Sequence, residues 1–162
     1  MQRRTLLKGG LAGGALLAAG GAAIVAGRDP LRDRATVLGA TIPALLDGAL
    51  PIAADARAAA IARCVDGVAV AIAAMPPAVQ HELDRLFVLL GSTIGRVLLA
   101  GVPSCWADAD TAEVSAFLER WRLHSMALFR TGYGALHDLV LGAWYADDAH
   151  WAAIGYDGPL SL

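Results

Sequence analysis

The chain is organised around the sequence DTAEVSAFLERWRLHSMALFRTGYGALHDLVLGAWYADDAHWAAIGYDGP, residues 110–159. Eight of the ten aromatic residues of the protein fall within it. Apolar and small side chains recur along it at the spacing of one helical face: Val114, Phe117, Leu118, Trp121, Ser125, Leu128, Phe129, Gly132, Leu136, Leu139, Val140 and Ala143. This stripe predicts a long helix or a gently broken pair of helices, and we expect the upstream helices to pack on it.

Both ends of this stretch carry helix-boundary signals. Asp110 is a predicted N-cap, and Glu113, three residues later, can reach back to complete a capping box. Gly155, Gly158 and Pro159 rule out continued helix at the other end.

Three further helices are predicted upstream. Asp29 and Pro30 begin a short one, which Pro43 and Pro51 interrupt. A stronger helix begins at Asp55 and ends at the Pro76-Pro77 pair. The third follows these prolines, and its predicted inner face comprises Leu83, Leu86, Phe87, Leu90, Ile94, Val97 and Leu98. Gly91 and Gly95 either weaken this helix by about 1 kcal/mol each or allow close approach of a neighbour, and we favour the second alternative.

The pattern predicts an all-α protein. No run of alternating apolar and polar residues indicates a strand. A chain of 162 residues, 57 % of them apolar, suits a single domain with its own core. We therefore expect a small helical bundle of about four or five helices over residues 28–162, after an N-terminal signal segment, residues 1–27.

Charge is distributed unevenly along the chain. Arg3, Arg4 and Lys8 precede all 15 acidic residues, which follow Arg28. The remaining ten arginines against 15 Asp and Glu give the body a net charge of about −5. Such a body has no general attraction for nucleic acid, so we expect no nucleic-acid partner.

The first 27 residues predict an export signal. Paired arginines, two leucines and a lysine precede an uncharged, Gly- and Ala-rich run, Gly9–Gly27, which is typical of a twin-arginine (Tat) signal. The residues expected to be recognised by the Tat translocase are Arg3, Arg4, Leu6, Leu7 and Lys8. The predicted location is the periplasm.

The fate of this segment after export stays open. The apolar run of ~19 residues approaches the ~20 that span a bilayer, although its glycines lower its membrane affinity. Small residues before Arg28 allow cleavage, but no clean Ala-x-Ala site is present. Cleavage and retention as an inner-membrane anchor are both possible outcomes. Because the Tat route carries folded proteins, it matters most for cargo that receives a cofactor before export.

The two cysteines allow a disulfide. In an exported protein, a Cys64–Cys105 bond is permitted, and closing this loop would contribute about 4 kcal/mol in the chain-entropy model. The alternative is that Cys64 is a small core residue. No Cys-x-x-Cys-His motif for covalent haem is present.

Other catalytic and metal-binding motifs are missing from the sequence. No two of the four histidines have the spacing of a helical metal pair. Asp147, Asp148 and His150 can form a carboxylate–imidazole cluster, although a solvated helix end is the commoner arrangement. No nucleophile elbow, P-loop or dinucleotide fingerprint is present, and Lys8 is the only lysine. We therefore predict no catalytic, cofactor-binding or metal-binding residue in this chain, and no enzyme activity of its own.

The C-terminal aromatic residues suggest a partner surface. Trp and Tyr are enriched among interface hot spots, and the glycines and proline present these rings from irregular chain. The residues predicted to contact a partner are Trp144, Tyr145, Trp151, Gly155, Tyr156, Gly158 and Pro159. Burial of these rings in the core is nearly as well supported.

Together, the Tat signal, the helical spacing and the ending Trp-x-x-Ile-Gly-Tyr-x-Gly-Pro, which begins at Trp151, resemble the gluconate 2-dehydrogenase subunit 3 family. Members are the small gamma subunits of membrane-bound flavin dehydrogenases. The resemblance implies a partner catalytic subunit of the glucose-methanol-choline oxidoreductase type, which binds FAD and lacks its own export signal. It also implies a multihaem cytochrome c subunit that accepts electrons and anchors the complex.

The expected function is therefore that of a non-catalytic small subunit in a periplasmic flavin-dependent sugar or alcohol dehydrogenase, with a chaperone-like role in export of the FAD-binding subunit. The alternative, from another class, is a stand-alone exported helical protein that binds a small ligand or the membrane.

Overall fold

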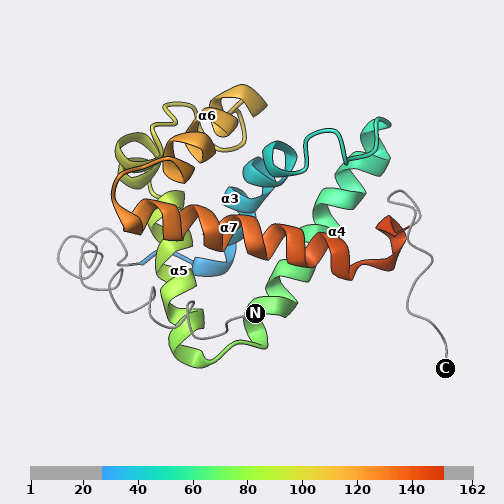
Figure 1. Ribbon diagram of the computed structural model, residues 1–162, viewed down its shortest axis with the longest axis horizontal. Coiled ribbons are helices and arrows are strands. Elements are labelled where there is room, and N and C mark those ends of the chain that lie inside the picture. The colour runs from blue at the N-terminus through green and yellow to red at the C-terminus, as the bar shows by residue number, and fades with distance from the viewer. Residues whose placement is uncertain (1–26, 152–162) are drawn as a thin grey trace.

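The computed structural model describes residues 27–151, which form an all-α fold without strands in that range (Figure 1). Within the described residues the α-helices are α3 (Pro30–Leu45), α4 (Ala54–Ala73), α5 (Pro77–Gly91), α6 (Thr111–Arg122) and α7 (Ala127–Ala146). A π-helix, η1 (Gly95–Ala100), follows α5, and a 3-10 helix, η2 (Asp148–His150), follows α7. The predicted small all-α domain is confirmed.

Helix α3 is the hub of the bundle. It contacts α4, α5, α6 and α7, and in Figure 1 it lies behind α7, which crosses the view. Asp29 caps it by accepting a hydrogen bond from the Leu31 N–H, and Pro30 occupies its first turn, as predicted. The prediction that Pro43 interrupts this helix is wrong, because α3 continues through it to Leu45. Since α5 packs mainly on α3 and η1, the prediction that everything packs on the 110–159 stripe is also wrong.

The C-terminal stripe forms a broken pair of helices. Its first member, α6, ends at Arg122, and α7 begins at Ala127. Asp110 caps α6 by accepting a hydrogen bond from the Glu113 N–H at 2.7 Å, as predicted. The Glu113 carboxylate does not return to Asp110 but accepts from the backbone N–H of Ser104 at 3.3 Å. Only the Asp110 half of the capping box is therefore formed. The Glu113 carboxylate instead holds the loop before α6 at Ser104.

The third predicted helix breaks earlier than expected. Helix α5 ends at Gly91, and the Ser92 side chain donates to the Leu89 carbonyl and accepts from the Gly95 N–H. A Cβ at Gly95 would lie 1.9 Å from the Leu89 oxygen, so only glycine fits this break. The predicted inward positions of Ile94, Val97 and Leu98 are wrong: these side chains are 52 %, 39 % and 74 % exposed.

Close helix approach occurs at Gly91, as predicted. A Cβ at this position would lie 2.6 Å from Oδ1 of Asp33 on α3. The Gly91 carbonyl also accepts a hydrogen bond from Nη2 of Arg28, which pairs with Asp33 through the same nitrogen. The start of α3 is thereby fixed to the end of α5.

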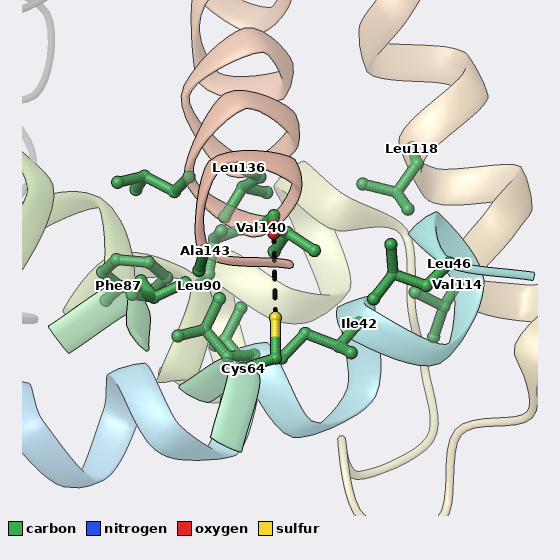
Figure 2. Packing of buried hydrophobic residues seen from close by; sticks show 14 of the residues in the cluster. Ile42, Leu46, Cys64, Phe87, Leu90, Val114, Leu118, Leu136, Val140 and Ala143 are labelled. Carbon is green, nitrogen blue, oxygen red and sulfur yellow. Dashed lines mark hydrogen bonds between the residues drawn. The ribbon is translucent and has the colours of Figure 1, made fainter. Parts of the chain in front are cut away.

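The core lies between α3 and the other four α-helices. Its fully buried large side chains come from several helices and include Val37, Leu38, Ile42, Val68, Phe87, Leu90, Val114, Phe117, Leu136 and Val140. Figure 2 shows Ile42, Phe87 and Leu136 converging on this core. Leu31, at the start of α3, lies outside this core and is 63 % exposed.

Candidate functional site

The end of α7 carries three of the residues that the sequence predicts to contact a partner. Trp144, Tyr145 and Trp151 lie here. The remaining predicted partner residues, Gly155, Tyr156, Gly158 and Pro159, lie outside the described residues, as do Arg3, Arg4, Leu6, Leu7 and Lys8 of the predicted signal.

Trp144 is a core residue. Its side chain is only 4 % exposed, and its ring is stacked on that of His150 with the centroids 3.4 Å apart and the planes at 10°. It lies one turn after Val140 on the buried face of α7, so the helix places it inward. Of the two alternatives for this ring, a partner surface or burial in the core, the described structure shows the buried arrangement.

Tyr145 and Trp151 lie nearer the surface. Tyr145, the next residue on α7, is 51 % exposed. The η2 turn brings Trp151 back towards it, and the Trp151 indole Nε1 donates a hydrogen bond to the Tyr145 carbonyl at 2.9 Å. Trp151 is half-buried. This hydrogen bond fixes Trp151, the first residue of the predicted C-terminal motif, beside Tyr145.

A set of charged and aromatic side chains closes the end of α7, and we call Arg63, Trp144, Asp147 and His150 the α7-end cluster. Oδ2 of Asp147 lies 3.1 Å from Nε of Arg63, on α4, and 3.2 Å from Nε2 of His150. Oδ1 of Asp147 accepts the N–H of Ala149 and so caps η2. One carboxylate therefore joins α4, α7 and η2.

This cluster corresponds in part to the predicted carboxylate–imidazole group. Asp147 and His150 come together as the sequence allowed, whereas Asp148 is exposed. Arg63 was not predicted, because it lies 84 residues from Asp147 and no local pattern links them.

The environment of the cluster lowers the pKa values of Asp147 and His150. The pKa of Asp147 is lowered, first by the Ala149 N–H and then by Arg63 and His150, against the opposing effect of burial. Burial lowers the pKa of His150; the Asp147 carboxylate acts in the opposite direction, and Arg63 adds to the lowering. The buried imidazole is therefore mainly neutral at neutral pH, which suits its stacking on Trp144.

Cys64 lies close to this cluster but forms no disulfide. Cys64 and Cys105 are both free, one buried and one exposed, so the alternative of Cys64 as a core residue is the one observed. Its thiol contacts the Val140 carbonyl at 3.7 Å (Figure 2). Burial, assisted by the charge of Asp147, raises the pKa of Cys64 to about 11. The thiol is thus protonated at neutral pH and is a poor nucleophile.

The α7-end cluster holds α4, α7 and η2 together. Its carboxylate is engaged by an N–H, a guanidinium and an imidazole, and its imidazole is covered by an indole ring. Across residues 27–151 no group of three or more His, Cys, Asp or Glu side chains has a geometry that can hold a metal ion. Within the same residues no helix is long and apolar enough to cross a bilayer.

The comparisons with known proteins add no relative. No family model, no curated protein and no solved structure matches this chain.

Proposed function

We propose that this chain is the non-catalytic small subunit of a periplasmic flavin-dependent sugar or alcohol dehydrogenase. In this role it supplies the Tat signal that exports the folded FAD-binding subunit and then stabilises that subunit. The observation that carries the proposal is the presence, in one small helical chain, of the twin-arginine motif at Arg3 and Arg4 and the ending that begins at Trp151.

The sequence motifs of the chain support the assignment of the flavin and the catalytic step to a partner subunit. No dinucleotide fingerprint is present in the sequence, so FAD belongs to the partner of the glucose-methanol-choline oxidoreductase type. A multihaem cytochrome c subunit would take the electrons. The thiol of Cys64 and the imidazole of His150 are both buried in the bundle, which leaves them poorly placed to meet a substrate.

The partner contact is best sought around Tyr145 and Trp151. Tyr145 exposes half of its surface, and Trp151 is held against its carbonyl. Both belong to residue types that are common among interface hot spots. Trp144 is excluded from this contact by its burial.

Export of the pair is the direct test. The chain is expressed with a candidate partner, a signal-less flavin oxidoreductase of the glucose-methanol-choline type, and flavin dehydrogenase activity is measured in the periplasm and the cytoplasm. Arg3→Lys with Arg4→Lys should leave both proteins in the cytoplasm. The matched control replaces Arg32 and Arg34, a second arginine pair outside the signal, with lysine and should export normally. Export of the flavin subunit with the double-lysine signal would contradict the proposal.

The alternative is a stand-alone exported protein that binds a small ligand or the membrane. It predicts that no flavin protein co-purifies with the chain from the periplasm, even after expression with the candidate partner. The subunit proposal predicts a yellow complex from which the isolated small subunit separates colourless. A flavin absorbance band on the isolated chain would contradict both the absence of a cofactor and the assignment of the flavin to a partner subunit.

A further inference from the structure

The π-helix η1 has an exposed side that is made of aliphatic side chains. We call these side chains the η1 patch: Ile94, Val97, Leu98 and Leu99, which are 52 %, 39 %, 74 % and 37 % exposed. The other residues of η1 are buried, so the helix presents one apolar side to the surface. Contiguous exposed apolar side chains commonly mark an interaction site.

The buried side of η1 holds the η1 patch outward. Arg96 takes the inward position, is 7 % exposed and donates through Nη1 to carbonyls of the following loop, including that of Val102 at 2.9 Å. On α6, Nε1 of Trp121 donates to the Leu99 carbonyl at 3.0 Å. The backbone of η1 is therefore fixed from two sides, and the patch cannot turn inward without breaking these bonds.

Guanidinium groups lie at both ends of the η1 patch. Nη2 of Arg28 donates to the Gly91 carbonyl before the patch at 2.8 Å, and Nη2 of Arg120 lies 3.4 Å from the Gly101 carbonyl after it. The charge of Arg28 is balanced by Asp33 at 2.6 Å. The exposed Arg120 has no carboxylate partner among residues 27–151, so its charge is available to an occupant of the patch.

The segments that form this surface are locally positive, although the body of the chain is negative. No acidic residue falls within residues 85–107, and Glu119 is the only one within residues 114–137. Glu119 pairs with Arg122 at 2.7 Å, so it does not compensate Arg120. An occupant that has negative groups around an apolar centre is therefore complementary to this surface.

An anionic lipid surface matches both parts of this description. Interfacial binding depends on apolar side chains that enter the boundary between headgroups and acyl chains, and on attraction to anionic headgroups. A guanidinium is well suited to lipid phosphate, because it can donate two parallel hydrogen bonds to it. A protein partner fits less well, because the η1 patch lacks Trp and Tyr, and Leu and Val are under-represented among interface hot spots.

We propose that the η1 patch docks on the surface of an anionic phospholipid bilayer, with Leu98 at the boundary of the acyl chains and Arg120 at the lipid phosphates. Figure 1 shows η1, coloured yellow, at the end of the bundle where α7 begins, whereas Tyr145 lies in the last turn of α7. The lipid contact is therefore separate from the surface proposed for the flavin subunit. The inference goes beyond the proposed function and does not depend on it.

A polarity-sensitive fluorophore on the full-length chain tests the contact. It is attached to Leu98→Cys, with Cys105→Ser to remove the exposed natural thiol. Cys64 is buried and has a pKa of about 11, so it stays unlabelled. The matched control carries the fluorophore on Val70→Cys of α4, because Val70 is 72 % exposed and Leu98 is 74 % exposed. Circular dichroism checks that both labelled chains keep the helical content of the parent.

Vesicles of phosphatidylcholine with phosphatidylglycerol should shift the emission of the Leu98 probe to shorter wavelength and leave the Val70 probe as in water. Sedimentation measures how much protein the vesicles hold. An unshifted Leu98 probe would overturn the proposal, whether or not another part of the chain holds the protein on the vesicles. A shift that needs no vesicles but grows with protein concentration would assign the patch to a second copy. A shift caused by the flavin subunit and not by vesicles would assign it to that protein, and either result would equally overturn the proposal.

The charged part of the contact is tested with Arg120→Gln, which keeps a donor for the Gly101 carbonyl but removes the positive charge. At low salt it should raise the concentration of anionic vesicles needed for half of the Leu98 shift by about fivefold. Arg57→Gln on α4 makes the same change of net charge and should leave this concentration as in the parent. On vesicles of phosphatidylcholine alone, Arg120→Gln should bind as the parent does. Equal effects of the two substitutions on anionic vesicles would contradict the contact between Arg120 and lipid phosphate.

Discussion

The indole ring of Trp144 lies face to face with the imidazole of His150, with the ring centroids 3.4 Å apart and the planes at 10°. This stack closes the end of α7, where Asp147 joins His150 to Arg63 on α4. The two rings are buried together, so the protonation of one affects the packing of both.

The first prediction concerns pH. In the unfolded chain His150 titrates at its ordinary value, near 6.5, and in the fold its pKa is lowered, first by burial. As pH falls through 6.5 the unfolded chain takes up a proton that the folded chain refuses, so the free energy of unfolding should decrease from there until the folded pKa is passed. The lowered pKa of Asp147 acts separately, because its stabilisation is lost only below its ordinary value of 3.8.

Urea unfolding at pH 7.5 and pH 5.5 measures this effect. His150→Gln should reduce the difference in unfolding free energy between the two pH values, whereas His81→Gln, at an exposed position, should leave it as in the parent. An NMR titration should place the pKa of His150 below 6.5. A pH dependence that survives in His150→Gln would assign it to another group.

The second prediction compares two glycines of α7. A Cβ at Gly132 would lie 2.6 Å from the Trp121 ring, whereas a Cβ at Gly134 would meet nothing within 4 Å. The Trp121 ring cannot move easily, because Phe117 and Phe129 pack at its edges. Gly132→Ala should therefore destabilise the fold by about 1–3 kcal/mol through overpacking.

Gly134→Ala is the matched control. It should stabilise the protein by up to about 1 kcal/mol through helix propensity alone. Thermal and urea denaturation report both values. Equal stabilisation by the two alanines would mean that the Trp121 ring yields, and that the α6–α7 contact is looser than its geometry indicates.

The third prediction concerns Arg96, whose guanidinium serves three loop carbonyls while almost completely buried. Arg96→Met keeps the length of the side chain but leaves these carbonyls without a donor, so it should cost about 2 kcal/mol or more. Arg130→Met is the control, because Arg130 also donates to main-chain carbonyls but is exposed, and its loss should stay within about 1 kcal/mol. Similar losses in the two variants would contradict the special role of Arg96.

The sequence predicted the features that depend on neighbouring residues. The caps formed by Asp29 and Asp110 act within three residues, and the prolines at 76 and 77 separate α4 from α5. Such local interactions are visible in one short stretch of sequence. The all-α class of the fold follows from the helical spacing of apolar residues along the sequence.

The features that the sequence did not predict depend on contacts between distant residues, or on the Ser92 side chain, which takes over backbone hydrogen bonds at the end of α5. The apolar spacing predicted that Ile94 and Leu98 face inward, but the Ser92 side chain breaks the helix and places Arg96 inside. For Trp144 the sequence leaves a partner surface and burial in the core nearly equal, because it does not show that His150 returns to stack on this ring. The role of α3 as the hub also depends on tertiary packing that periodicity does not encode.

The last prediction uses two adjacent aromatic residues of α7 with opposite exposure. Trp144 is 4 % exposed and Tyr145 is 51 % exposed. Trp144→Ala should cost about 3–5 kcal/mol of unfolding free energy, as for a large ring removed from a core. Tyr145→Ala should leave the free energy of unfolding within about 1 kcal/mol of the parent, because about half of this side chain is exposed to solvent. Urea denaturation of the small subunit measures both values.

If the proposed function holds, the affinity for the flavin subunit should respond in the opposite way from stability. Tyr145→Ala, which leaves the fold stable, should weaken binding, and Trp144→Ala, which destabilises the fold, should not. Tyr145→Ala should weaken the complex by about 2 kcal/mol, roughly thirtyfold, because an aromatic anchor is lost from the interface. The folded fraction of Trp144→Ala should bind as the parent does, because its ring faces the core. Titration of the purified flavin subunit against each variant measures these affinities. Parent-like binding by Tyr145→Ala would show that this ring is not an anchor for the partner.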